Sequence, residues 1–111
     1  MSIQIKNHDV LAELLHGYHA KLIEVMVWIV CRYSTVVITS GWRGDTGIHS
    51  LGRAIDLRSW VYERPSDVAV DINSHWEYDA KRPGLLVCLR HGPPDHFHIQ
   101  AGDRTLYKRT F

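Results

Sequence analysis

The segment from Gly92 to Ile99 is the part of the sequence that most narrowly restricts the fold. Two consecutive prolines follow Gly92, and because proline lacks a backbone N–H and its ring collides with a preceding helical turn, this point has to be a turn. The next residues alternate: His96 and His98 are polar, whereas Phe97 and Ile99 are apolar. Side chains two residues apart on a strand share a face. The segment therefore predicts a strand beginning near His96, with two imidazoles on one face and core residues on the other.

The same alternation occurs in a second predicted strand, residues 54–60. Asp56 falls on the opposite face from Ile55 and Leu57, so its carboxylate can point into a cleft while its neighbours pack. His49 precedes Asp56 by seven residues, and a glycine-containing turn between them lets both side chains reach one ion. Taken alone, these two residues fit a hydrogen-bonded pair without metal equally well.

Metal-competent side chains are concentrated in these two segments, which contain His49, Asp56, Asp95, His96 and His98. A catalytic zinc site needs three protein ligands, one open coordination position and a general base. The two segments together supply that set, and they predict a zinc site at which they converge.

The rest of the chain predicts one α+β domain over residues 1–111, with a small antiparallel sheet flanked by helices. Apolar residues at intervals of three and four predict helices, and β-branched or alternating stretches predict strands. The expected elements are a helix capped by Asn7 or Asp9 and running to about Arg32, a strand over Thr35–Thr39, a loop over Trp42–Ile48, a helix from Pro65 to about Asp79, a strand over Leu85–Leu89 and an edge strand over Thr105–Lys108.

Composition argues against several kinds of partner. The chain of 111 residues carries 13 basic and 12 acidic residues, which are interspersed and give a formal charge of +1, so no electrostatic footprint for nucleic acid is present. The most hydrophobic segment is about ten residues, well below the ~20 that cross a bilayer. The N-terminus has no secretory signal pattern. We expect a monomeric protein made in the cytoplasm, with neither nucleic acid nor membrane as a partner.

Three motifs resemble one enzyme family. The pattern His-x-x-Gly-x-Ala-x-Asp over residues 49–56, the tetrad Asp-His-x-His over residues 95–98 and the segment Ser40-Gly-Trp-Arg43 occur in that family's order. They resemble the zinc D-alanyl-D-alanine carboxypeptidases and L-alanyl-D-glutamate endopeptidases, which act on peptidoglycan stem peptides. The resemblance spans roughly residues 35–100, and it implies the fold shared with the hedgehog signalling domain.

The resemblance also implies a role for each matching residue. His49, Asp56 and His98 look like the ligands of one zinc ion per chain, and Asp95 looks like the catalytic base. Arg43 looks like the residue that binds the substrate carbonyl or carboxylate. His96 matches a histidine that lies beside the metal in some members. The implied activity is a zinc metallopeptidase, a hydrolase that degrades the cell wall.

The sequence leaves the exact activity open. A bare catalytic domain of this kind would suit a phage endolysin released to the wall, by analogy with other lytic systems. One alternative is a zinc-stabilised binding domain of the same fold that has lost turnover, and a more distant one is a structural protein with coincidental His and Asp pairs. Whether the bond cut is D-Ala-D-Ala, L-Ala-D-Glu or a cross-bridge depends on the shape of the pocket.

Overall fold

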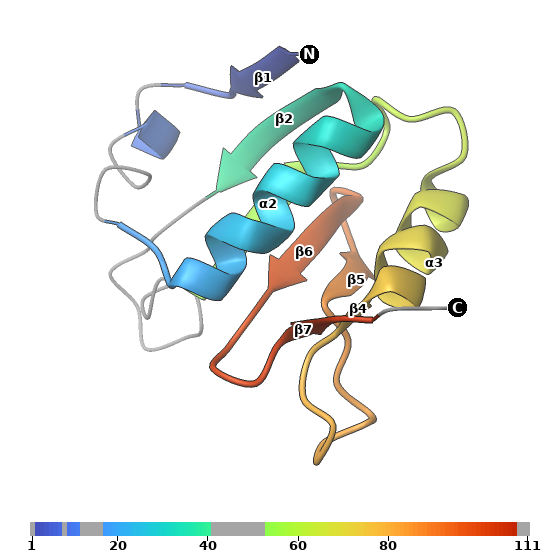
Figure 1. Cartoon of the computed structure of the whole chain (residues 1–111). Helices are drawn as coiled ribbons and strands as arrows, with labels where there is room; N and C mark the ends of the chain where they lie inside the picture. The colour runs from blue at the N-terminus through green and yellow to red at the C-terminus, as the bar shows by residue number, and fades with distance from the viewer. Residues whose placement is uncertain (1, 8, 12–16, 41–52, 109–111) are drawn as a thin grey trace.

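A computed structural model describes residues 2–7, 9–11, 17–40 and 53–108 of the chain, and it shows an α+β fold built on a five-stranded sheet (Figure 1). The strands of this sheet, in spatial order, are β1 (Ser2–Ile5), β2 (Thr35–Ser40), β3 (Ala54–Arg58), β6 (His96–Gln100) and β5 (Cys88–His91).

The sheet is mixed. β1 pairs with β2 in parallel, whereas every other pairing in the sheet is antiparallel. The expectation of a purely antiparallel sheet was therefore wrong at one edge. The strand Ser2–Ile5 had no counterpart in the sequence reading, because a parallel partner 33 residues away leaves no local turn signal.

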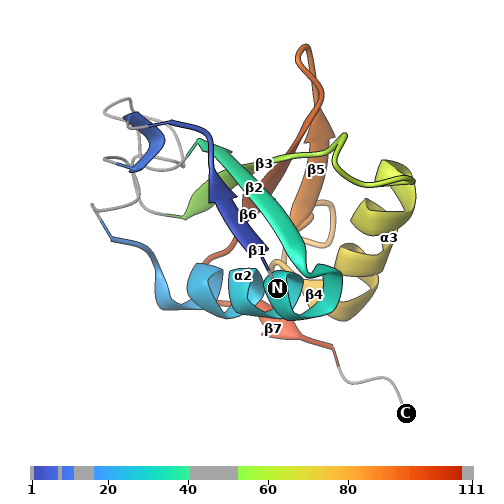
Figure 2. The same cartoon turned by 90° about the horizontal axis from the view of Figure 1, so that it is seen from above.

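Helix α2 (Ala20–Tyr33) covers one face of the sheet (Figure 2). It is shorter than the single helix expected from Asn7 or Asp9 onward, because Gly17 has a φ of +93°, which a right-handed helix does not allow. His19 is its N-cap, and the ring Nδ1 of His19 accepts a hydrogen bond from the Lys21 amide at 3.1 Å. Asn7 caps a separate helical turn, accepting a hydrogen bond from the Val10 amide at 3.0 Å.

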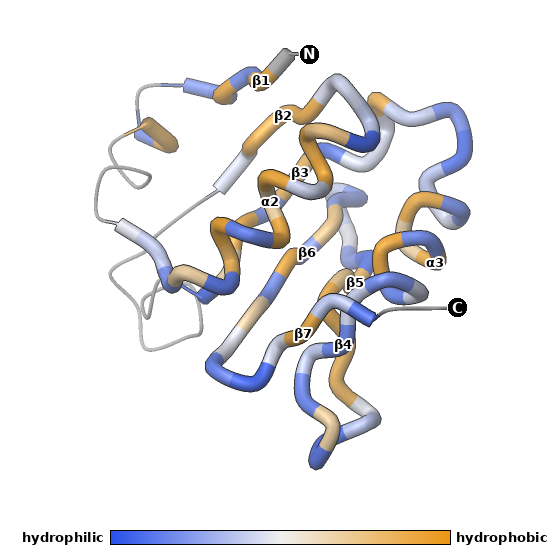
Figure 3. The backbone as a smooth tube through the Cα atoms, viewed as in Figure 1, coloured by the Kyte–Doolittle hydropathy of each residue, from blue (hydrophilic) through white to orange (hydrophobic). Residues whose placement is uncertain are grey.

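The core lies between α2 and the sheet. Its fully buried members include Leu22 and Val25 of α2, and Phe97, Ile99 and Leu57 of β6 and β3 belong to the same cluster. Figure 3 shows the apolar residues gathered along α2 and the strands it covers, with hydrophilic residues in the turns. Burial of these side chains, each contributing roughly 1.5–3 kcal/mol, sets which face of β3 and β6 points to the core.

Helix α3 (Pro65–His75) packs beside β5 and is followed at once by the short strand β4 (Trp76–Glu77). The helix ends before the predicted Asp79 because Trp76 is extended and pairs with Tyr107. The second strand of this pair is β7 (Leu106–Tyr107), so β7 joins β4 and forms no hairpin with β6.

The start of β5 also differs from its prediction of Leu85–Leu89. The side-chain amide of Asn73 on α3 bonds both the N–H and the C=O of Cys88 at 2.9 Å, and the strand begins there.

In the described part of the chain, no helix is long and apolar enough to span a membrane.

Candidate metal site

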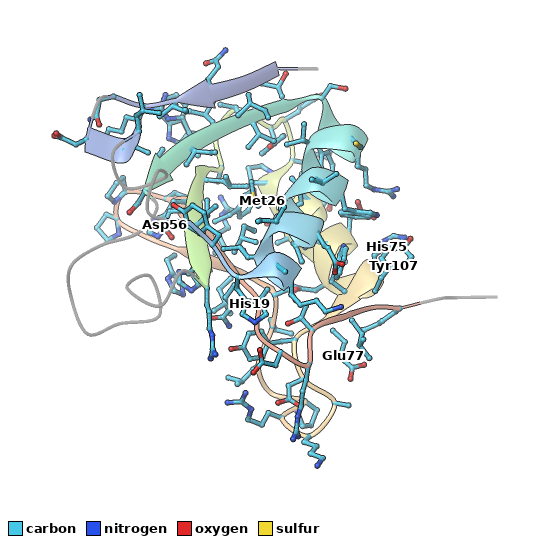
Figure 4. All side chains as sticks on the ribbon, turned by 60° about the vertical axis from the view of Figure 1, so that its left-hand side comes forward. His19, Met26, Asp56, His75, Glu77 and Tyr107 are labelled. Atoms are coloured by element: carbon cyan, nitrogen blue, oxygen red, sulfur yellow. The ribbon has the colours of Figure 1, made fainter. Side chains whose placement is uncertain are left out.

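The antiparallel pairing of β3 with β6 places Asp56 directly opposite His98. Asp56 Oδ1 lies 3.3 Å from His98 Nδ1, and the two residues are only 7% and 8% exposed. Because Ile55, Leu57, Phe97 and Ile99 belong to the core under α2, Asp56 and His98 occupy the other face of the sheet. Figure 4 shows Asp56 on the side of β3 away from α2.

The other ring nitrogen of His98 faces an amide oxygen. Its Nε2 lies 3.1 Å from Gln100 Oε1, while Gln100 Nε2 donates a hydrogen bond to the Leu86 carbonyl at 2.8 Å. Since the Gln100 amide nitrogen is committed to Leu86, the oxygen facing His98 can only accept. His98 must therefore carry a proton on Nε2, and its Nδ1 side is the one turned toward Asp56.

Two lone-pair acceptors would otherwise meet between Nδ1 and the carboxylate. In the neutral Nε2–H tautomer, Nδ1 is a lone-pair acceptor facing a second acceptor, which is repulsive. A proton between the two atoms, carried by the imidazole or by the carboxyl group, or a cation bound by both atoms removes that repulsion. Tetrahedral zinc with Zn–N and Zn–O distances near 2.1 Å would separate two ligand atoms by roughly 3.4 Å. The observed 3.3 Å suits a shared metal ion as well as an ion pair.

Asp95, the expected base, makes a different set of contacts. Arg90 donates to both of its carboxylate oxygens, from Nε at 2.9 Å and from Nη2 at 3.0 Å, and the Ser59 hydroxyl donates to Oδ2. The hydrogen bonds from Arg90, and then that from Ser59, lower the pKa of the Asp95 carboxyl below its ordinary value. Asp95 is thus held as a carboxylate whose lone pairs are already engaged.

His96 lies at the start of β6, on the same face as His98. Its Nδ1 is 2.8 Å from the Pro94 carbonyl oxygen, and its ring meets the His91 ring edge-on at 5.7 Å. His91 also stacks on His98 with ring centroids 5.5 Å apart. The strand ends beside the turn therefore gather three imidazoles, and His91 was not among the residues predicted for the site.

Two predicted site residues, Arg43 and His49, lie outside the described residues. Within residues 2–7, 9–11, 17–40 and 53–108, no group of three or more His, Cys, Asp and Glu side chains could hold a metal ion. The part of the chain that is described thus contains two candidate ligands, Asp56 and His98, and neither lacks a partner.

The contacts of Gln100 and Arg90 had not been predicted. Gln100 is two residues after His98 in β6, so strand alternation alone could have placed both on one face. Arg90 reaches Asp95 across the β5–β6 turn, and that contact depends on a register the sequence does not specify.

The site and the fold together define a small α+β domain with a buried histidine–carboxylate pair across two central strands. Comparison with known proteins gives no match: no protein-family profile, no curated protein and no solved structure is significantly similar to this chain.

Proposed function

We propose that the chain is a zinc-dependent peptidase of the hedgehog/D,D-peptidase fold that hydrolyses peptide bonds in peptidoglycan stem peptides, as a D,D-carboxypeptidase or an L-Ala-D-Glu endopeptidase. The observation that supports this most is the orientation of His98. Its Nε2–H is committed to Gln100, so its Nδ1 faces the Asp56 carboxylate at the separation expected of two zinc ligands.

The third ligand in this proposal is His49. It belongs to the segment 41–52, which joins Ser40 to Arg53, and Ser40 pairs with Asp56 across β2 and β3. His49 is four positions before the described residue Arg53, a stretch that spans at most about 14 Å when extended. This tether is compatible with a ligand role because it allows His49 to reach Asp56 and His98.

The chemistry would then divide among the residues as follows. His49, Asp56 and His98 would hold the zinc ion, which would supply a nucleophilic water at neutral pH and polarise the scissile carbonyl. Asp95 takes up a proton from the attacking water and passes it to the leaving amine, which requires its carboxylate to leave at least one of its contacts with Arg90 and Ser59. Arg43 binds the substrate carbonyl or carboxylate, and a protonated His96 stabilises the developing oxyanion.

Elemental analysis of protein that has not been exposed to a chelator tests whether the chain binds zinc. About one zinc per chain is expected, and Asp56→Asn, His98→Ala and His49→Ala should each lose it. Asp67→Asn provides a matched control, because Asp67 is an exposed carboxylate on α3. Absence of any bound transition metal would exclude the proposed site. A digest of purified peptidoglycan then tests the activity, and new amino or carboxyl termini in the stem peptides are the expected products.

The contacts of Asp95 favour one second candidate, a zinc-stabilised binding domain without turnover. An acid that is held by two hydrogen bonds from Arg90 and one from Ser59 can serve the structure alone. One zinc per chain together with an undigested, bound peptidoglycan would support this candidate over the peptidase. In that class of protein Asp95 would contribute to the turn and would take no part in chemistry.

A further inference from the structure

A polar cavity of about 260 Å³ lies at the end of the sheet where β3 begins and β6 ends. Three arginines from three separate segments line it: Arg53 just before β3, Arg82 in the connection between β4 and β5, and Arg104 in the turn between β6 and β7. The turn that carries Arg104 is hydrophilic in Figure 3. Nothing in the proposed metal site uses this cavity.

The wall of the cavity is held by buried hydrogen bonds. The Thr105 hydroxyl accepts from the Gly102 amide at 2.9 Å and donates to the Tyr78 carbonyl at 3.0 Å, and Thr105 is fully buried. Asp79 and Tyr78 are also buried. The turn after β6 and the segment after β4 are therefore fixed relative to each other, which preserves the shape of the cavity before any ligand binds.

Asp79 serves to orient one of the arginines. Its Oδ1 accepts from the Lys81 amide at 2.9 Å and its Oδ2 from Arg82 Nε at 3.1 Å. The Lys81 hydrogen bond, followed by that of Arg82, lowers the pKa of Asp79 below its ordinary value. The Arg82 guanidinium also lies over the Tyr78 ring, 5.5 Å from its centre. Both Asp79 oxygens are thus engaged, while Arg82 has used one nitrogen of three.

The guanidinium groups around the cavity offer more hydrogen-bond donors than the nearby carboxylates can accept. Asp103 at the rim is 78% exposed and contacts His19 at 2.7 Å and, more loosely, Arg53 at 4.0 Å. Figure 4 labels His19 beneath the start of α2, near this rim. Within the described ranges Arg104 makes no hydrogen bond or close ion pair, although its positive charge acts on both Asp79 and Asp103. Three guanidinium groups therefore face two carboxylates, and the donors of Arg104 are unused.

We propose that this cavity is a binding site for an anionic group, and that the group is a carboxylate of a peptide ligand. Guanidinium forks donate in pairs to carboxylate oxygens, and the volume suits a side chain or chain terminus. Arg53 stands three residues before Asp56, which is about 10 Å along a strand. Use of this cavity by a stem peptide bound at the proposed zinc site rests on the proposed function, whereas carboxylate binding does not.

Titration of the full chain with N-acetylglutamate, followed by amide NMR, tests the site without metal or turnover. Saturable shifts confined to residues near 79–82 and 101–105 are expected. Arg104→Gln and Arg82→Gln should each weaken binding about tenfold. Arg64→Gln is the matched control, since Arg64 is 80% exposed on another part of the surface and should leave binding unchanged.

Two further arms give results that a simple loss of folding would not imitate. Asp103→Asn removes the rim carboxylate and should tighten binding severalfold, while N-acetylglutaminamide, which carries no carboxylate, should produce no saturable shift at these residues. Absence of saturation with N-acetylglutamate, or equal affinity in Arg104→Gln and the parent, would overturn the site. Tighter binding of inorganic phosphate than of N-acetylglutamate would overturn the assignment to carboxylate. Peptidoglycan hydrolysis without N-acetylglutamate binding would refute this site alone and leave the peptidase proposal standing.

Discussion

Arg90 and Asp95 form a two-point ion pair across the β5–β6 turn, with Nε to Oδ1 at 2.9 Å and Nη2 to Oδ2 at 3.0 Å. The third guanidinium nitrogen of Arg90 donates to the Ser66 hydroxyl at 2.9 Å. One side chain therefore ties the turn that precedes His96 and His98 to the first turn of α3. Movement of that turn would change the position of Asp95 and of the imidazoles that follow it.

Arg90→Gln should make the stability of the protein less sensitive to acid. The pair with Arg90 lowers the folded-state pKa of Asp95, so its stabilising effect is complete above the unfolded-state pKa and is lost as the pH falls through the folded-state pKa. We expect a lower free energy of unfolding for Arg90→Gln at pH 7 and convergence with the parent as the pH falls through the folded-state pKa of Asp95. Urea denaturation at a series of pH values measures the free energy of unfolding of the variant and of the parent. A deficit that is the same at every pH would mean that packing, and not the charge of Asp95, accounts for the effect.

The variant Asp95→Asn tests whether Asp95 acts as the general base and not as a zinc ligand. The amide keeps the size of the side chain but accepts no proton, so zinc content should match the parent while hydrolysis of stem peptides is lost. Paired metal analysis and peptidase assays make the comparison. Activity equal to the parent would show that another group takes the proton.

Gln100→Leu should weaken zinc binding without removing a proposed ligand. Gln100 Oε1 accepts from His98 Nε2, and partners of this kind usually change metal affinity by about 10–100-fold when lost. Competition with a chelator of known zinc affinity gives the zinc dissociation constant of the variant and of the parent. Gln4→Leu, on the exposed β1 strand, is the control for the same substitution elsewhere. If both variants bind zinc like the parent, the orientation of His98 is not set by Gln100.

Arg43→Lys tests the residue that the sequence motifs assign to the substrate. A lysine keeps the charge but loses the planar pair of donors, so kcat/KM on a stem peptide should fall by about an order of magnitude or more. Folding and zinc content should stay as in the parent. Unchanged kinetics would indicate that Arg43 does not bind substrate and only forms an ion pair at the surface, which contributes only ~0–1 kcal/mol to stability.

The sequence predicted the faces of β3 and β6 correctly, because alternation of apolar and polar residues depends only on near neighbours. Asp56 and His98 were accordingly expected to avoid the core, and both do. Their direct opposition is a matter of strand register, which the pattern restricts but does not specify. The separate contacts of Asp95 were missed for the same reason, since Arg90 faces it only through the observed β5–β6 pairing.

Helix boundaries were predicted less well, because tertiary contacts decided them. Apolar spacing continued from Leu11 to Ile29, yet the left-handed Gly17 and the capping ring of His19 divide that stretch. Likewise Trp76 fits the apolar face of α3 but is extended, because it pairs with Tyr107. A periodic pattern identifies which residues become buried more dependably than it identifies where an element ends.

The parallel pairing of β1 with β2 also bears on the order in which the strands of the sheet assemble. Ser2 meets Thr35 across 33 residues, whereas His91 meets His96 across five. Closing the longer loop costs about 1.7 kcal/mol more entropy by the logarithmic dependence on loop length. The β5–β6 hairpin is thus suited to form early, and β1 to join an already assembled sheet. In native-state hydrogen exchange, the amide of Lys6, which donates to the Ile38 carbonyl at this edge, should open at a lower free energy than those of Phe97 and Ile99, so that this edge separates while the strands bearing Asp56 and His98 stay paired.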